Sequence, residues 1–341
     1  MNIIDFPRSD VYGNKYDKAD LEIWYVSSIS TEIYNRLVKD VLPTTSKGSK
    51  EQKLTERVIR HLPHILVMTP ARMERYAKAI DKIYGGILMY KPHKKLRSTP
   101  FGMQLIDAFN YEGYRKNKLV ELSARLNVKT CPYCNMSYTL YSEKVVPGKK
   151  RVPQYDKLAK FQFDHFYSKR KYPMLSMSLY NLIPACPTCN QEKSDKNLSL
   201  LFHPYHSTIH TLFSFQVTRP TPGFYGARIV DYVPVQLKWV PGVPVKEQKE
   251  YEDTYHLAVL YSRHGDIVQE VYDKTFENPY YLNGANFTFL SNRGKDYLKR
   301  LWFDDYMKPD LIHRRPLSKF KQDVFEQALR DRQLLEREGL L

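Results

Sequence analysis

The sequence has no long apolar run and few cysteines. No stretch of about 18 consecutive apolar residues is present, so we expect no transmembrane helix and no membrane partner. Asp5, Arg8 and Asp10 replace the apolar core of a signal peptide near the first residue, which predicts a cytoplasmic protein. Four cysteines in 341 residues are too sparse for a secreted disulfide scaffold, the competing interpretation of paired cysteines.

The positive charge of the chain is unevenly distributed. The formal net charge is +16 at pH 7, of which residues 1–130 contribute +9, residues 131–210 +6 and residues 211–341 only +1. A basic surface suits a polyanion, and nucleic acid is the usual one, although many basic proteins bind none. The 27 tyrosines could supply stacking platforms for bases, but tyrosine is also a common core residue.

Hydrophobic patterning predicts an α+β protein in three regions. Residues 1–125 are expected to be mainly helical, residues 126–205 to hold the chemical motifs, and residues 206–341 to be mixed. In the first region the apolar residues recur at three- and four-residue spacing. This spacing predicts helices over 29–41 and 52–65. Pro70 and Ala71 could open a third helix over 72–84 that ends at Gly85-Gly86, and a further helix is expected over 102–125.

The second and third regions contain strand patterns. We expect a hairpin in the second region, with strands over 137–146 and 152–163 and a turn at 147–151. In the third region, alternation of apolar and polar residues predicts strands, and helical spacing then returns. These expected strands are 213–217 and 233–239, and the expected helices are 254–271, 293–305 and 317–338.

The four cysteines form two Cys-x-x-Cys pairs, Cys131/Cys134 and Cys186/Cys189. Each pair places two thiolates on one tight turn, and two pairs complete the tetrahedral sulfur set that structural zinc prefers. The metal would close the loop between the pairs and stabilise a small module. A redox function of one pair is the alternative, but two matched pairs with no cysteine left over favour zinc.

Three polar segments lie with these cysteines: Asp164-His165, then Asn181-Leu-Ile-Pro, then Asn190-Gln-Glu-Lys193. Together with the cysteines they resemble the HNH, or ββα-metal, endonuclease family over residues 131–196. One position departs from the common pattern, since Asn190 stands where many members have histidine. The resemblance implies a zinc-braced ββα-metal HNH core inserted between the N-terminal helical region and the C-terminal mixed region.

The resemblance also implies a role for each residue. His165 would be the general base, Asn181 would hold the connecting loop and orient His165, and Asp164 and Asn190 would bind a catalytic Mg²⁺ or Mn²⁺. The side chains expected to meet nucleic-acid phosphates are Lys193, Lys169 and Arg170. Phosphodiester hydrolysis needs such groups on chemical grounds alone. An imidazole with an ordinary pKa near 6.5 accepts a proton at neutral pH, and oxygen ligands suit a hard cation.

Each of these residues also has a structural interpretation. An Asp-His pair is common on protein surfaces, Asn181 could cap a turn, and Lys193 could lie on a solvated helix face. The order of the motifs within one set of cysteine pairs favours the catalytic interpretation. His203 and His206 follow closely but are separated by a proline and have no evident carboxylate partner, so we expect packing or surface histidines.

We therefore expect an HNH endonuclease that hydrolyses phosphodiester bonds of nucleic acid, with DNA favoured over RNA. The alternatives are a non-catalytic zinc-braced nucleic-acid-binding module and a restriction-type HNH endonuclease, although no sequence-reading domain is evident. The helical region leading into residues 127–135 and the segment 315–319 are similar to HNH effectors of bacterial antiphage systems, the Septu type in particular. That similarity implies an ATPase partner, with residues 211–341 as the candidate docking surface.

Overall fold

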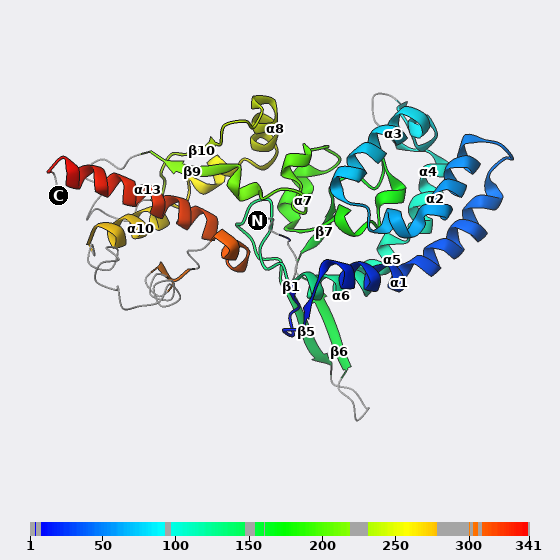
Figure 1. Ribbon diagram of the computed structural model, residues 1–341, viewed down its shortest axis with the longest axis horizontal. Coiled ribbons are helices and arrows are strands. Elements are labelled where there is room, and N and C mark those ends of the chain that lie inside the picture. The colour runs from blue at the N-terminus through cyan, green and yellow to red at the C-terminus, as the bar shows by residue number, and fades with distance from the viewer. Residues whose placement is uncertain are drawn as a thin grey trace. The chain divides into compact units, whose positions relative to one another are not determined.

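The chain divides into two compact units (Figure 1). The computed structural model describes Ile4 and residues 8–92, 97–146, 154–159, 161–218, 231–277, 300, 303–305 and 309–339. Unit 1 comprises Met1–Val128 and Thr139–Ser207, and unit 2 comprises Lys129–Tyr138 and Thr208–Leu341. The helical first region therefore shares a unit with most of the expected motif region. No helix among the described residues is both long and apolar enough to cross a membrane.

Unit 1 is built mainly from helices. These are α1 (Lys18–Arg36), α2 (Lys50–Leu66), α3 (Pro70–Leu88), α4 (Pro100–Phe109), α5 (Tyr111–Arg115), α6 (Lys118–Leu126) and α7 (Pro187–Lys193). A π-helical turn, Leu37–Val41, and a 3-10 turn, Leu42–Thr44, continue α1. Apolar side chains at helical spacing on the first three helices are buried, as the sequence predicted. They are Tyr25, Ile29 and Ile33, then Leu54, Val58 and Leu62, then Met73, Ala77 and Ile80.

The helix boundaries differ from the sequence prediction in three places. α1 begins at Lys18 rather than at residue 29, because Asp17 and Asp20 form a capping box there. α3 continues through Gly85-Gly86, since burial of Leu88 offsets the low helix propensity of glycine. The expected helix over 102–125 is three helices, because the backbone turns left-handed at Asn110, with φ 49°, and leaves helical geometry again at Asn117.

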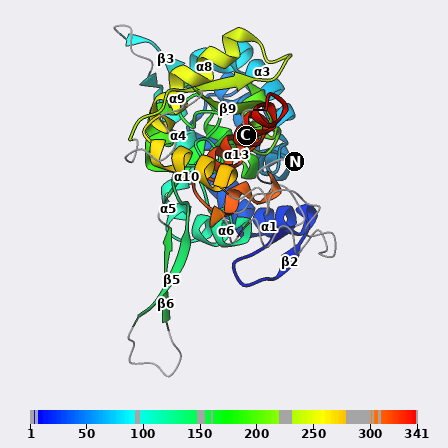
Figure 2. The same ribbon diagram turned by 90° about the vertical axis from the view of Figure 1, so that its left-hand side faces the viewer.

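The strands of unit 1 form antiparallel pairs. The pairs are β1 (Arg8–Ser9) with β2 (Lys15–Tyr16), β3 (Met89–Tyr90) with β4 (Arg97–Ser98), β5 (Tyr141–Val146) with β6 (Gln154–Ala159), and β7 (Gln162–His165) with β8 (Leu182–Ala185). The expected hairpin is present as β5 and β6, which extend away from the helices of their unit in Figures 1 and 2. Its predicted turn at 147–151 lies outside the described residues. The expected second strand is divided, since 162–165 pair with β8 instead.

Unit 2 combines one strand pair with helices. The strands are β9 (Phe213–Val217) and β10 (Val235–Trp239), and the helices are α8 (Val245–Tyr255), α9 (Leu257–Tyr261), α10 (Gly265–Glu277) and α13 (Ser318–Arg337). Both strands and α13 are found where the sequence predicted them. The expected helix over 254–271 is interrupted at His256, whose φ of 49° ends α8. Most of the expected helix over 293–305 lies outside the described residues.

Helix α13 completes the hydrogen bonding of β9. Strand β10 pairs with one edge of β9, and two side chains of α13 reach the other edge. Asp323 Oδ2 accepts from Phe215 N at 2.8 Å, and Gln327 Oε1 accepts from Val217 N at 3.0 Å. Gln327 Nε2 also donates to Val217 O at 2.9 Å. A helix thus occupies the place where a third strand would pair.

Replacing Gln327 tests this arrangement. Gln327→Leu leaves the N–H and C=O of Val217 buried without their partners, so we expect the free energy of unfolding to fall by about 2–3 kcal/mol. Gln333→Leu on the exposed side of the same helix is the control and should change it by less than about 0.5 kcal/mol. Denaturant unfolding measures both, and equal effects of the two substitutions would contradict the assignment.

Candidate active site and metal centre

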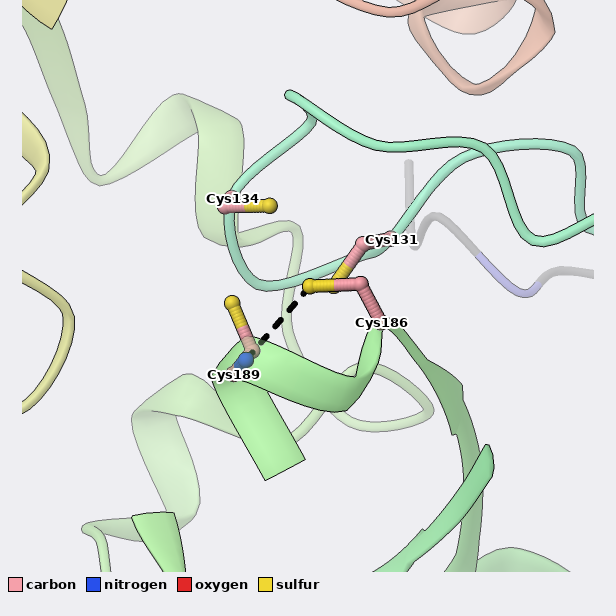
Figure 3. A group of neighbouring side chains, drawn as sticks. All are labelled: Cys131, Cys134, Cys186 and Cys189. Atoms are coloured by element: carbon pink, nitrogen blue, oxygen red, sulfur yellow. Dashed lines mark hydrogen bonds between the residues drawn. The ribbon is translucent and has the colours of Figure 1, made fainter. Parts of the chain in front are cut away.

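The four cysteine side chains converge on one point (Figure 3). Their Sγ atoms all lie within 4.8 Å of one another, each residue is buried, and none of the four forms a disulfide. Tetrahedral zinc with Zn–S bonds of about 2.3 Å needs sulfurs about 3.8 Å apart, so a small contraction would complete the site. Among the described residues, no other group of three or more His, Cys, Asp or Glu side chains could hold a metal ion.

Local backbone geometry orients the thiols. In the second pair, Cys186 is the N-cap of α7, and its Sγ accepts from Cys189 N at 3.4 Å. In the first pair, Cys134 Sγ accepts from Met136 N at 3.3 Å, and Asn135 N donates to Cys131 O at 2.8 Å. Backbone N–H groups aimed at sulfur stabilise the thiolate that a metal requires. The buried sulfur set is therefore compatible with structural zinc.

Asn135 connects the turn of the first cysteine pair, Cys131 and Cys134, to the rest of unit 2 through hydrogen bonds. It has a left-handed backbone, with φ 51°, and a buried side chain. Its Nδ2 donates to Thr130 Oγ1 and to Ile312 O, both at 3.0 Å, and its Oδ1 accepts from Lys319 N at 3.0 Å. No role was predicted for this residue from the sequence. An Asn directly after a Cys-x-x-Cys pair is the signal that could have pointed to a left-handed turn.

The second motif folds as two strands and a helix within unit 1. β7 and β8 pair antiparallel, with Asp164 opposite Ile183 and His165 opposite Leu182, and α7 follows β8 after one residue and packs on β7. Asp164 and His165 therefore end one strand, and Asn190 projects from the helix. All three line one pocket of about 330 Å³.

The His165 ring is held in one tautomer. Its Nε2 lies 2.9 Å from Ser176 O, and because a carbonyl only accepts, Nε2 carries the proton and Nδ1 is left as the acceptor. Tyr111 packs its ring edge against the imidazole, with 4.5 Å between the ring centroids. Burial, reinforced by the nearby Lys169, lowers the pKa of His165 from 6.5 to about 3, so the ring is neutral at physiological pH.

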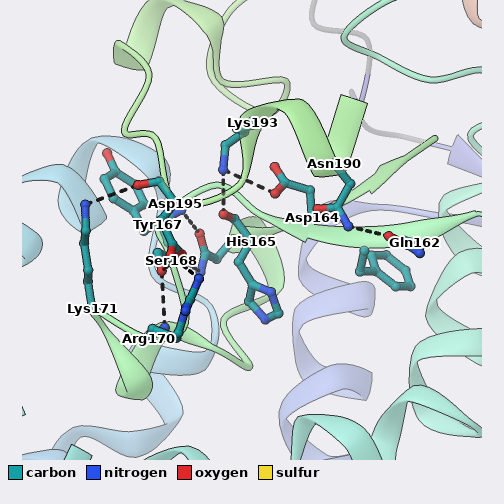
Figure 4. Close-up of polar contacts among 12 residues, drawn as sticks. Gln162, Asp164, His165, Tyr167, Ser168, Arg170, Lys171, Asn190, Lys193 and Asp195 are labelled. Carbon is teal, nitrogen blue, oxygen red and sulfur yellow. Dashed lines mark hydrogen bonds and ion pairs between the residues drawn. The ribbon is translucent and has the colours of Figure 1, made fainter. Parts of the chain in front are cut away.

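Asp164 is paired with a lysine inside the protein (Figure 4). The Lys193 side chain is fully buried, and its Nζ lies 3.2 Å from Asp164 Oδ1 and 2.8 Å from His165 O. From the sequence we expected Lys193 to meet a phosphate, and the alternative was a solvated helix face. In the structure its ammonium is instead enclosed, because the C-terminal turn of α7 packs against the end of β7.

The amide of Asn190 is oriented by Gln162, a residue that the sequence analysis did not single out. Asn190 Nδ2 donates to Gln162 Oε1 at 2.5 Å. This hydrogen bond identifies which amide atom is the nitrogen and therefore which one is the oxygen that could bind a metal. Both residues line the same pocket as Asp164. Gln162 is two residues before Asp164 on β7, and that period-two spacing could have indicated it.

Asn181 holds the loop that follows β7. Its Oδ1 accepts from Tyr167 N at 2.7 Å, and its Nδ2 donates to Tyr167 O at 3.0 Å and to Leu175 O at 2.9 Å. The side chain is fully buried and does not line the pocket. These contacts suit the loop-holding role that was expected. The effect of Asn181 on catalysis stays a prediction.

Lys169 and Arg170 lie at the pocket, each paired with an acid. Lys169 Nζ is 2.9 Å from Glu112 Oε1 and 4.4 Å from the centroid of the Tyr111 ring. Arg170 pairs with Asp195, which also accepts from Ser168 Oγ at 2.6 Å. Both basic side chains remain partly exposed, so an incoming phosphate could exchange with the acids.

His203 and His206 differ in environment. His203 is fully buried against the Phe166 ring, and its Nδ1 accepts from Tyr205 N at 3.2 Å, whereas His206 is exposed. One is thus a packing residue and the other a surface residue, as the sequence indicated.

Comparison with family models, with curated proteins and with solved structures gave no match, so no relative informs the interpretation of these sites.

Zinc at the cysteines predicts a measurable metal content. Cys189→Ser removes one of four ligands, so we expect bound zinc to fall from about one ion per chain and the melting temperature to drop by about 10 °C or more. Thr188→Ser, between the two cysteines of the same pair, is the control and should leave the zinc content and the melting temperature unchanged. Elemental analysis and thermal melting measure the two quantities. A wild-type protein without stoichiometric zinc would contradict the assignment.

The buried histidines predict a loss of stability in acid. Burial lowers the pKa of His203 well below 6.5 and that of His210 to about 3, so the unfolded chain binds these protons more readily than the folded chain. Stability is therefore full above pH 6.5 and declines below it, by up to about 1.4 kcal/mol per pH unit for each histidine. His203→Phe should make this decline shallower between pH 6.5 and 5, and the exposed His206→Phe should not. Unfolding measured across pH tests the difference.

Proposed function

We propose that the chain is a metal-dependent endonuclease of the HNH type that hydrolyses phosphodiester bonds, with DNA favoured. One observation carries the proposal: the β7–β8–α7 arrangement brings Asp164, His165 and Asn190 to a single pocket. A neutral imidazole with a defined acceptor nitrogen, a carboxylate and an amide oxygen are a sufficient set for this reaction. The four-cysteine cluster, with one pair at the start of α7, supports the same interpretation.

The reaction assigned to these residues is an in-line displacement. Nδ1 of His165 takes a proton from water, the water oxygen attacks phosphorus, and the bond from phosphorus to the 3′ oxygen breaks, that oxygen taking a proton from solvent. The negative charge of a bound phosphate favours imidazolium, which would raise the low pKa of His165 toward the range of an effective base. Lys169 and Arg170 would position the neighbouring phosphates.

Asp164 and Asn190 are the residues that would hold the catalytic cation. A carboxylate and an amide oxygen fit Mg²⁺ or Mn²⁺, which keep several water ligands and need few protein oxygens. When bound, such an ion offsets charge on the phosphate and on the departing oxygen. The antiphage role, the ATPase partner and the docking surface in residues 211–341 stay predictions from the sequence resemblance.

A binding module without catalysis is the second candidate. The low pKa of His165 favours it, because a base that holds a proton so weakly is a poor proton acceptor until substrate changes its surroundings. Such a module would bind nucleic acid through the same basic side chains at the pocket, Lys169 and Arg170. The two candidates differ only in whether the nucleic acid is cut.

Plasmid cleavage separates the two functions. With Mg²⁺ or Mn²⁺ we expect wild type to nick or cut supercoiled DNA and His165→Ala to lose at least about 100-fold in rate while binding DNA equally. His206→Ala, an exposed histidine, is the control and should cut as wild type does. Equal cutting by wild type and His165→Ala refutes the assigned base. Binding without cutting by either protein, on DNA and RNA alike, favours the binding module.

A further inference from the structure

Lys193 occupies an unusual place for a lysine. Its side chain has 0% exposure, and its ammonium contacts Asp164 Oδ1 at 3.2 Å, the His165 carbonyl at 2.8 Å and the face of Phe166 at 5.6 Å from the ring centroid. Moving an ammonium out of water is costly unless an anion and hydrogen-bond acceptors replace the water. Asp164 is therefore tied to a lysine partner within the fold.

The same helix carries the second proposed metal ligand. Asn190 lies three residues before Lys193, so the two side chains leave neighbouring positions of α7 toward the end of β7. A divalent cation held by Asp164 and Asn190 would consequently lie a few ångströms from the Lys193 ammonium. Like charges at that separation repel strongly where water is excluded, and the repulsion must weaken cation binding.

We propose that Lys193 is a built-in counter-ion that competes with the divalent metal for Asp164. This inference rests on the proposed function, because it takes Asp164 as a metal ligand. Without substrate, Lys193 neutralises Asp164 and the metal binds weakly. A phosphate entering the pocket adds negative charge beside both cations, so metal and nucleic acid bind cooperatively, each raising the affinity of the other by the same factor.

The arrangement gives Lys193 a role different from phosphate contact. Its ammonium positions the Asp164 carboxylate and sets the affinity of the site for cations, while the pocket that receives substrate is lined by Lys169 and Arg170 instead. A nuclease with such a site holds its catalytic metal firmly only when nucleic acid is present. In the absence of substrate, the site is held in an unreactive, charge-balanced state.

Metal affinity without nucleic acid tests the proposal. Binding of Mn²⁺ to the zinc-loaded full chain is measured by the electron paramagnetic resonance signal of the free ion. Lys193→Met removes the charge at similar length, and Lys193→Gln removes the charge but keeps a donor for Asp164. We expect both to bind Mn²⁺ about tenfold more tightly than wild type. Lys196→Met, the same charge change at an exposed position nearby, is the control and should change affinity less than about twofold.

Unchanged or weaker Mn²⁺ binding by both neutral variants overturns the proposal. Because Asp164 loses its counter-ion, these variants are also expected to melt lower than wild type without metal and to gain more melting temperature from Mn²⁺. If neither variant folds without metal, recovery of folding by Mn²⁺, and not by NaCl of equal ionic strength, supports the proposal. Failure of Mn²⁺ to restore folding overturns it.

A double variant separates this inference from the proposed function. Asp164→Asn combined with Lys193→Met removes both members of the ion pair, so no buried charge is left alone. If Asp164 is a ligand, the double variant loses the Mn²⁺ binding of Lys193→Met. Equal binding by the single and double variants places the metal elsewhere and refutes the proposed metal site. Loss of binding in the double variant, with wild-type affinity in Lys193→Met, refutes the counter-ion alone.

Discussion

The buried ammonium of Lys193 constrains the surroundings of the candidate site. An ammonium without water must find acceptors, and here the acceptors belong to the last two residues of β7. This requirement fixes the C-terminal turn of α7 against the end of that strand. Asn190, one turn earlier on the helix, is thereby brought to the pocket that Asp164 and His165 line. Strand, helix and pocket are coupled through Lys193, together with the hydrogen bond from Asn190 to Gln162.

Local chemistry could be predicted from the sequence, and the burial of the Lys193 side chain could not. The spacing of the cysteines was enough to predict their convergence, because each pair forms its own turn. Helical periodicity found most of the helices of unit 1, but not the breaks at Asn110, where the backbone turns left-handed, and at Asn117, whose side chain accepts from Lys118 N. Lys193 stands among Glu, Ser, Asp and Lys residues, a context typical of a solvated helix face. It is enclosed by the end of β7, whose position is set by pairing with a strand 17 or more residues later, and by the ring of Phe166.

The tyrosines of the chain illustrate the same limit. Their abundance was open to two interpretations, base stacking or core packing. Several described, buried tyrosines donate their hydroxyl protons to backbone carbonyls distant in sequence, four of them at 3.2 Å or less. The pairs are Tyr25 with Met177 O, Tyr111 with Phe163 O, Tyr251 with Tyr133 O and Tyr261 with Cys134 O. A tyrosine ring is long enough to cross a core, and its hydroxyl satisfies a backbone carbonyl far along the chain.

The contact between α13 and β9 has a consequence for biosynthesis. The N–H groups of Phe215 and Val217 receive their acceptors from residues 108 and 110 positions later in the chain. At translation rates of about 5–20 residues per second, the edge of β9 stays unpaired for roughly 5–20 seconds after it is synthesised. During that interval the nascent chain presents an open template for strand addition. Strand addition at this edge is therefore open to a competing strand only until α13 has been synthesised and has folded against β9.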